Sequence, residues 1–360
     1  MDFTVPEAQA DLAALTRRIT EDWAAKNPHP GDSGLDRDLW AVLARSGILD
    51  AALPASIGGG ALGITAHAAV LTELGRTVAP APYLDSILVG AETIVEYGTP
   101  AQIEQWALPV LRGTDTVAAV FGDDHTGFVA TVAGDGWRLN GAQTAVSSAA
   151  FADTLLIEAD TPDGPALFLV PRDAQGISVT RQHVVNGTDT ALVEAAAAPV
   201  PRDARLVGAD APARARRLAT IGWCAWQAGV TERALELTAE YARTREQFGK
   251  QIGSFQAVRQ RLADAYIDVE AVRLTALEAA WREAEGLDAA AEIATAKFWA
   301  AEAGHRVAHT TVHVHGGVGT DTEHPTHRYF VAAKRAEFAL GGATAHLRAL
   351  GAILAGRNPA

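Results

Sequence analysis

Two stretches of the sequence carry residue types that could bind a diphosphate beside a flat ring. The first, residues 241–256, ends one helix and begins another, and it contains Arg245 and Phe248. An arginine at a helix boundary offers paired donors to a pyrophosphate, and a phenylalanine can pack against a flat ring. The second, residues 313–319, contains paired glycines whose backbone N–H groups could approach phosphate oxygens. Taken singly, each feature has a plainer interpretation: a surface ion pair, ordinary core and a simple turn.

Histidines recur at every fourth position in the helix that leads to this glycine pair. His305, His309 and His313 therefore share one helical face, and His315 follows. Such spacing can bind a metal ion, but no cysteine lies nearby and the sequence indicates no carboxylate to orient the histidines. We therefore expect no metal site here.

The composition is that of a folded globular chain without disulfides. The 360 residues are 48% hydrophobic and 20% charged, with a formal net charge of -13, which excludes a disordered tail and disfavours nucleic acid as a partner. The single cysteine, Cys224, excludes an intramolecular disulfide and fits a reducing compartment. The N-terminus has no basic segment before an apolar core, and no apolar run could span a bilayer, so we expect a cytoplasmic protein without membrane contact.

Three regions of different periodicity must position these residues. Residues 1–114 carry apolar side chains at helical spacing, residues 115–207 break into short β-type runs, and residues 208–360 return to long helices. The predicted fold class is α+β, with a helical N-terminal domain, a small antiparallel β middle domain and a C-terminal four-helix bundle.

Periodicity and turn residues predict the individual elements. The expected helices of the first region cover residues 8–24, 36–46, 64–77 and 100–112, and the expected strands cover 116–121, 128–132, 154–158, 166–170 and 177–180. The glycines at 134 and 136 and the pair Asn140 and Gly141 are residues that tight hairpins require. In the last region, Gly286 ends one helix and Asp288 can cap the next.

The stretch 241–256 resembles the acyl-CoA dehydrogenase family, in which an Arg-x-x-Phe-Gly run, then Ile-Gly and Phe-Gln, joins two helices of the C-terminal bundle. The resemblance covers the whole chain. Other segments similar to family motifs are the proline-then-glycines loop 54–63, Glu73-Leu74-Gly75-Arg76, Trp137-Arg138-Leu139-Asn140-Gly141, and His313-Val314-His315-Gly316-Gly317-Val318-Gly319 followed by Thr322-Glu323. The resemblance implies FAD as the cofactor and α,β-dehydrogenation of an acyl-CoA thioester as the reaction.

Carried over by position, the resemblance also implies half of an FAD site. In the family, these positions hold the ADP half of an FAD that is bound mainly by a neighbouring subunit. The corresponding residues here are Arg245, Phe248, Gln256, Gly316 and Gly317, with His313 in place of the usual glutamine.

The catalytic base of the family is missing from its expected position. Removal of the α-proton requires a base, and the family's glutamate, which precedes a glycine, corresponds to Leu340 here. Residues 338–360 contain no Asp or Glu. The alternative family position falls near Ala219, and residues 211–231 contain no acidic residue either. Glu337, one helical turn before Leu340, could be a displaced base, but we favour a solvated helix residue.

The loop that lines the flavin ring in the family also differs. Its place is taken by residues 120–127, where Asp123 and Asp124 are expected to be turn residues, and the family's Trp-Ile-Thr run reads Ala145-Val146-Ser147. Contacts to the ring are thus lost while contacts to the dinucleotide persist.

This contrast predicts a division of labour between subunits. We expect a heterotetramer in which this chain contributes the ADP half of the FAD site, and a paralogous catalytic subunit contributes the flavin ring and the base. Two alternatives stay open: a homomeric flavoenzyme with an unusual base or oxygen chemistry, and a non-catalytic acyl-CoA-binding or structural homologue.

Overall fold

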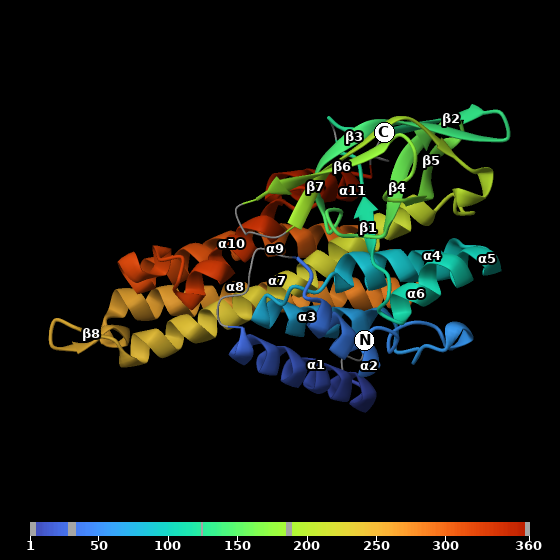
Figure 1. Cartoon of the computed structure of the whole chain (residues 1–360). Helices are drawn as coiled ribbons and strands as arrows, with labels where there is room; N and C mark the ends of the chain where they lie inside the picture. Colours follow the sequence, from blue (N-terminus) through green and yellow to red (C-terminus); the bar gives the residue numbers. More distant parts are fainter. Residues whose placement is uncertain (1–4, 28–33, 124, 185–188, 357–360) are drawn as a thin grey trace. The chain divides into compact units, whose positions relative to one another are not determined.

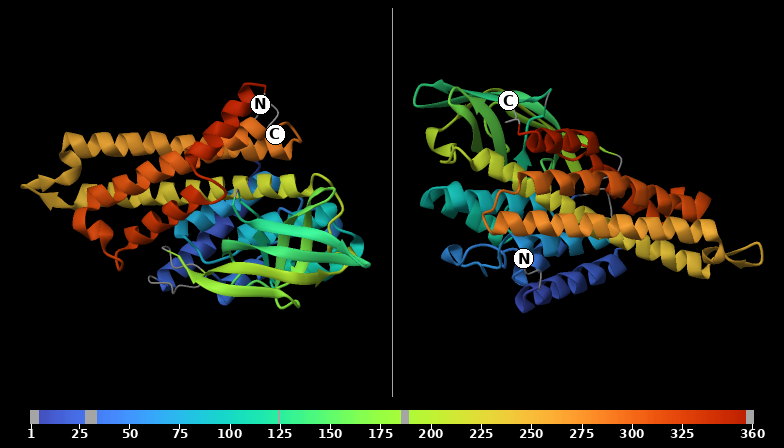
Figure 2. Two further views of the ribbon diagram at one scale, coloured as in Figure 1. Left: turned by 90° about the horizontal axis from the view of Figure 1, so that it is seen from above. Right: turned by 180° about the vertical axis from the view of Figure 1, so that it is seen from behind.

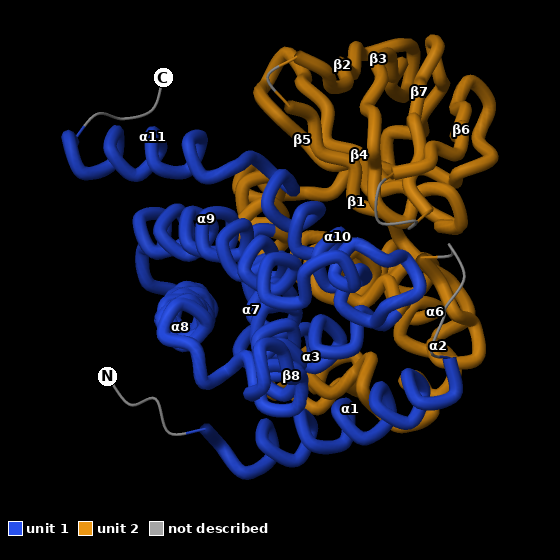
Figure 3. The backbone as a smooth tube through the Cα atoms, turned by 90° about the vertical axis from the view of Figure 1, so that its left-hand side faces the viewer, with its two compact units in different colours: residues 1–30, 63–79, 220–360 blue, residues 31–62, 80–219 orange. Residues whose placement is uncertain are grey.

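The computed structural model describes residues 5–27, 34–123, 125–184 and 189–356, which form two compact units (Figure 3). One unit comprises residues 1–30, 63–79 and 220–360, and the other comprises residues 31–62 and 80–219. The division into three domains at residues 114 and 207 stays a prediction. No described helix is both long enough and apolar enough to cross a membrane.

The first unit is a set of long helices with one short hairpin. Its helices are α1 (Glu7–Lys26), α3 (Gly63–Thr77), most of α7 (Ala211–Thr244), α8 (Gln256–Ala284), α9 (Ala290–His315), α10 (Pro325–Phe338) and α11 (Ala343–Leu354). Helices α7, α8, α9 and α10 run side by side, as Figures 1 and 2 show, and form the predicted bundle. Helix α11 is an additional helix that the four-helix prediction did not include.

Small residues let the helices of this unit approach closely. The bundle core contains Val230, Ala234, Ala265, Val269, Val307, Ala308, Tyr329, Ala332 and Ala333. A Cβ atom on Gly229 of α7 would lie 1.9 Å from the carbonyl oxygen of Thr72 in α3, and one on Gly75 would lie 2.1 Å from the carbonyl oxygen of Trp226. Because these helices cross at backbone contact, both positions require glycine.

The predicted boundary between α8 and α9 is confirmed. Helix α8 ends at Ala284, and Gly286 follows with a φ of +65°. The Asp288 carboxylate accepts a hydrogen bond of 3.1 Å from the Ala290 N–H at the first turn of α9. Gly286 thus ends α8 as expected, whereas the N-cap of α9 is Ala289, and Asp288 accepts its hydrogen bond from one position earlier.

The second unit combines short helices with a sheet. Its helical elements are α2 (Arg37–Arg45), a π-helical segment Leu84–Ala91, α4 (Glu92–Tyr97), α5 (Pro100–Gln102), the π-helical Ile103–Ala107 and α6 (Leu108–Leu111). Its strands are β1 (Val117–Val120), β2 (Gly127–Ala133), β3 (Gly136–Ser147), β4 (Thr154–Thr161), β5 (Gly164–Pro171), β6 (Ile177–His183) and β7 (Asp189–Val200). The predicted helices and strands of this region are therefore present, together with the segment 84–97 and the long strands β3 and β7, which were not predicted.

The sheet is mixed, so the prediction of an antiparallel domain is only partly right. The strand order is β1-β4-β2-β3-β7-β6, and β5 pairs with β4. Strands β1 and β2 both pair with β4 in parallel, whereas the other pairings are antiparallel. Strand β5 pairs with β4 along its whole length, whereas β1 pairs with residues 154–157 of β4 and β2 with residues 159–160.

One of the two predicted hairpin turns is correct. Gly134, with a φ of +63°, and Asp135 connect β2 to β3. Asn140 and Gly141 instead lie inside β3, where the register with β7 shifts. A Cβ atom on Gly141 would lie 2.1 Å from the carbonyl oxygen of Gly127, so this glycine permits a close approach between strands at an irregularity.

Candidate dinucleotide site

The connection between α7 and α8 is a two-residue hairpin with an exposed aromatic tip. Strands β8 (Glu246–Gln247) and β9 (Lys250–Gln251) flank Phe248 and Gly249, whose φ values of +56° and +75° are typical of a type I′ turn. The Phe248 side chain is 91% exposed, so it is not a core residue. A bulky residue in the left-handed region is uncommon and costs free energy. Core packing does not offset that cost here.

Arg245 and Gln256 lie at the two ends of this hairpin. The Arg245 carbonyl accepts a hydrogen bond of 2.8 Å from the Ile252 N–H, which closes the connection. Its side chain is exposed, and it has no hydrogen bond or ion pair with any residue that the structure describes. Gln256 is the first residue of α8 and is exposed. Both side chains are therefore available to a ligand.

The second predicted stretch forms an open turn at the end of α9. Gly316 has a φ of +65° and a ψ of −142°, a conformation accessible essentially only to glycine. No described atom lies within 4 Å of the position that a Cβ atom would take on Gly316 or on Gly317. His313 is exposed, while its carbonyl accepts the hydrogen bond from the Gly316 N–H. The turn thus leaves space for a group to approach its backbone.

A ring stack joins the helix ends that carry these two stretches. The Tyr241 ring in the last turns of α7 stacks on the His315 ring at the end of α9, with centroids 4.3 Å apart and an interplanar angle of 21°. One turn earlier, the Thr238 hydroxyl donates a hydrogen bond of 3.2 Å to the hydroxyl of Thr311. Burial lowers the pKa of His315, so its imidazole is neutral at pH 7.

Leu340, the predicted counterpart of the family's glutamate, lies in a well-fixed turn after α10. Leu340 has a φ of +56°, and its carbonyl accepts a hydrogen bond of 2.9 Å from His346. The fully buried ammonium of Lys297 donates hydrogen bonds to the carbonyls of Ala336, Glu337 and Gly341, at 3.1, 3.2 and 3.0 Å. Burial lowers the pKa of this lysine. The turn is rigidly held, but the side chain that it presents at position 340 carries no acid–base group.

Glu337 is an ion-paired residue, so the expectation of a solvated residue is wrong. Its side chain is only 14% exposed, it contacts Lys334, and its carboxylate lies 3.2 Å from the Nδ1 atom of His305. The other possible base position, Ala219, is buried in α7. Within the described residues, the carboxylate nearest in sequence to Leu340 is thus bound by two basic side chains.

In the loop before β2, the Asp123 carboxylate is hydrogen-bonded to neighbouring residues. The Asp123 carboxylate accepts hydrogen bonds from the N–H groups of His125 and Thr126, both at 2.8 Å, and from the side chain of Gln143 at 3.3 Å. These bonds, led by the one from His125, lower the pKa of Asp123 to about 2. The prediction that Asp123 is a turn residue is confirmed. Asp124 lies outside the described residues.

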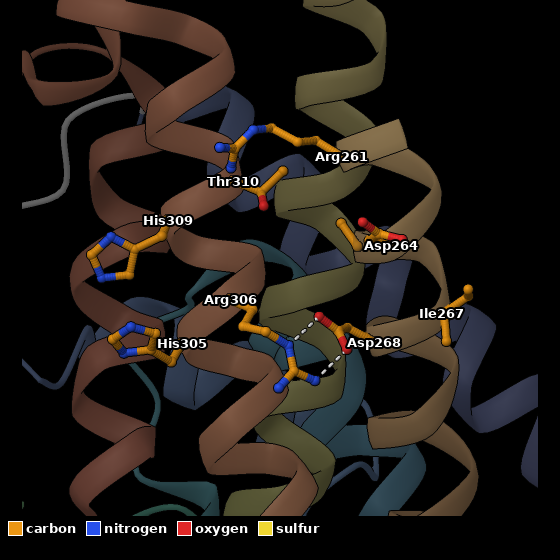
Figure 4. Close-up of a pocket in the computed structure, with 9 residues that line it drawn as sticks. Arg261, Asp264, Ile267, Asp268, His305, Arg306, His309 and Thr310 are labelled. Carbon is orange, nitrogen blue, oxygen red and sulfur yellow. Dashed lines mark hydrogen bonds and ion pairs between the residues drawn. The ribbon is translucent and has the colours of Figure 1, made fainter. Parts of the chain in front are cut away.

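The histidine face of α9 borders a groove of about 590 Å³ between α8 and α9 (Figure 4). The rings of His305 and His309 lie 4.3 Å apart, and Arg306 is paired with Asp268. In the part of the chain that the structure describes, no group of three or more His, Cys, Asp or Glu side chains is placed to hold a metal ion.

Comparison with known proteins identifies relatives along the whole chain. Family models of the acyl-CoA dehydrogenase N-terminal and C-terminal domains match residues 6–114 and 216–354. Acyl-CoA dehydrogenase FadE27 of Mycobacterium tuberculosis is 45% identical over 99% of each chain. Among solved structures, a chain of the ChsE4-ChsE5 complex from Mycobacterium tuberculosis aligns over 100% of both chains with a TM-score of 0.95 and 44% identity. A chain of the Tcur3481-Tcur3483 steroid ACAD G363A variant aligns over 97% of this chain and 98% of its own, with a TM-score of 0.91 and 36% identity.

Proposed function

We propose that this chain, which belongs to the acyl-CoA dehydrogenase family of FAD-dependent oxidoreductases, is the subunit of a heteromeric acyl-CoA dehydrogenase that binds the ADP half of FAD. A paralogous subunit supplies the environment of the flavin ring and the catalytic base. The observation that carries the proposal is a contrast. The residues at the dinucleotide positions are exposed and open, whereas the position of the base holds Leu340.

The residues at the dinucleotide positions fit an ADP group. The free guanidinium of Arg245 can donate two parallel hydrogen bonds to a pyrophosphate. The space beside Gly316 and Gly317 lets phosphate oxygens reach backbone N–H groups. The exposed Phe248 ring offers a flat apolar surface for the adenine, and its strained backbone is typical of a residue kept for binding.

Among the described residues at the family's base and ring-side positions, no side chain is placed to supply the remaining parts of the reaction. When bound, FAD accepts the hydride that leaves the β-carbon of the thioester. The α-proton needs a carboxylate with free access, but Leu340 has none, and Glu337 is held by Lys334 and His305. In the ring-side loop, the hydrogen bonds of Asp123 are satisfied within the loop itself. These features favour a partner-supplied base over the homomeric alternative.

The relatives suggest both the partner and a first substrate to test. Two of the solved structures contain pairs of differently named proteins, ChsE4 with ChsE5 and Tcur3481 with Tcur3483. We therefore place this chain in a heterotetramer with a paralogous acyl-CoA dehydrogenase. Because the second of these relatives is named a steroid ACAD, the CoA thioester of a steroid side chain is the first substrate to test.

Co-expression with candidate paralogues tests the proposal. We expect the chain purified alone to hold little FAD, and native mass spectrometry of the complex to show two kinds of subunit with bound FAD. Replacing Arg245→Ala in the complex should weaken FAD binding by about tenfold or more, because a charge-assisted hydrogen bond is lost. Arg243→Ala is the matched control, since Arg243 is equally exposed two residues earlier. Stoichiometric FAD in the isolated chain, bleached by acyl-CoA, would refute the division of labour.

A further inference from the structure

The stack of Tyr241 on His315 has no assigned role, although each ring lies close in the chain to a residue of the proposed dinucleotide site. Tyr241 is one helical turn before Arg245, whose N–H donates a hydrogen bond of 2.8 Å to the Tyr241 carbonyl. His315 directly precedes Gly316 in the chain. Each ring therefore belongs to the last ordered turn of a helix, immediately before residues that face the ligand.

We infer that Tyr241 and His315 form a positioning pair that fixes Arg245 relative to the Gly316–Gly317 turn. The inference rests on the proposed function, since it concerns the same ADP site. Neither ring needs to touch the ligand. The pair would act by holding two helix ends, from α7 and α9, in one arrangement.

The orientation of His315 is fixed on every side that the structure describes. Its ring is 5% exposed, and its Nδ1 atom lies 2.8 Å from the Thr311 carbonyl. A carbonyl can only accept, so Nδ1 carries the hydrogen in this contact. The ring of His324 lies 5.3 Å from the ring of His315. The Nδ1 atom of His324 accepts a hydrogen bond from the N–H of Thr326 at the start of α10. The stack thus joins the ends of α7 and α9 to the beginning of α10.

The glycine turn itself rests on His315. A Cβ atom on Gly319 would lie 3.0 Å from the Cβ of His315 and 3.0 Å from the Cα of Val312, so the turn folds back onto the end of α9. Glycines lose more conformational entropy on ordering than other residues, and helix ends fray. The open turn needs a fixed neighbour, and the end of α9 at Val312 and His315 provides it.

The stack of Tyr241 on His315 joins the last turn of α7 to the last turn of α9. The Thr238–Thr311 hydrogen bond lies one turn deeper, and the hydrogen bond from the Ile252 N–H to the Arg245 carbonyl holds the residue just after the last turn of α7. An arginine side chain has several rotatable bonds, so its affinity for a diphosphate depends on how well its backbone is placed. Removal of the Tyr241 ring should weaken the site without unfolding the bundle.

The test compares Tyr241→Leu with Tyr241→Phe in the complex with the paralogous subunit, with ADP as the probe because it lacks the flavin ring. We expect Tyr241→Leu to weaken ADP binding about fivefold, equivalent to about 1 kcal/mol at 25 °C. Tyr241→Phe keeps the ring and should bind like the wild type. Amide hydrogen exchange at residues 316–319 should become faster in the leucine variant alone. Tyr266→Leu, at a tyrosine that is 60% exposed on α8, is the matched control.

The outcomes separate the inference from the proposed function. If Arg245→Ala abolishes ADP binding while Tyr241→Leu changes neither affinity nor exchange, the positioning role is refuted and the ADP site stands. If complexes that contain the wild-type chain and the Arg245→Ala chain bind ADP equally, or neither complex binds it, the proposed function fails and the inference fails with it. An equal loss of affinity in the leucine and phenylalanine variants would also overturn the role of the ring.

Discussion

Gly317→Ala is the substitution that most sharply separates ligand binding from folding. Gly317 does not have a positive φ, and no described atom lies within 4 Å of the position of an added Cβ. A methyl group is thus accommodated without strain. Because alanine has a higher helical propensity than glycine by roughly 1 kcal/mol, the free energy of unfolding should stay the same or rise slightly in the helical segment Gly316–Thr320.

The effect on the dinucleotide should have the opposite sign. If a phosphate oxygen approaches the backbone at Gly317, the added methyl group occupies part of that space. Loss of one hydrogen bond to a charged group costs about 1.5–3 kcal/mol, which corresponds to roughly a tenfold to hundredfold weaker affinity for ADP. Gly316→Ala is less informative, because its φ of +65° with a ψ of −142° adds a folding penalty of about 1–3 kcal/mol.

Calorimetric titration with ADP, together with urea unfolding, measures both quantities on the same variant. Gly351→Ala in α11 is the matched control, since no described atom lies within 4 Å of its added Cβ either and it lies far along the chain from the glycine turn. Both variants should be at least as stable as the wild type, and only Gly317→Ala should lose affinity. Wild-type affinity in Gly317→Ala would refute the claim that phosphate approaches this turn.

Three further predictions concern stability and the base. Gly229→Ala should lower the free energy of unfolding, measured in urea, by about 3 kcal/mol. The new Cβ would lie 1.9 Å from the Thr72 carbonyl oxygen and must push α3 away from α7. Wild-type stability of this variant would contradict the close crossing of α3 and α7. Glu337→Gln should leave acyl-CoA oxidation by the complex unchanged while lowering stability by about 1 kcal/mol through the lost ion pair; a large loss of turnover at preserved FAD content would make Glu337 the base. The pKa of Asp123 is lowered to about 2, so its contribution is complete above pH 3.8 and is lost as the pH falls toward 2. An NMR titration of its carboxyl carbon with a midpoint near 3.8 would contradict the hydrogen-bonded loop.

The sequence predicted the helical parts of the fold better than the sheet. Long amphipathic stretches such as α8 have strong periodicity, and their ends are marked by Gly286 and Asp288. Strand β7 was missed because its run 195–198 is four alanines, which have low β propensity and show no alternation of polarity. The Asn140–Gly141 pair was interpreted as a turn because its local chemistry suits one. Only the pairing of β3 with β2 and β7 makes it a bulge.

Candidate site residues could be chosen from the sequence, but the contacts that support them could not. Arg245, Phe248 and the two glycines belong to a recognisable motif, and the structure places their side chains or backbone in the open. Nothing local indicates that Tyr241 meets His315, since the two are 74 positions apart and their contact depends on how α7 and α9 pack. Lys297 could have been noticed as a lone charge within an apolar, alanine-rich run, but its three carbonyl partners follow only from the tertiary structure.

The ammonium of Lys297 fixes the backbone of the turn after α10 independently of the side chain at position 340. All three of its hydrogen bonds go to main-chain carbonyls, which every amino acid possesses, so the backbone path is specified without reference to the side chain at position 340. After a gene duplication, one copy could therefore exchange its acid–base group for a hydrocarbon and still fold. Two paralogues of the same fold, one with the acid–base group and one without it, are the expected result.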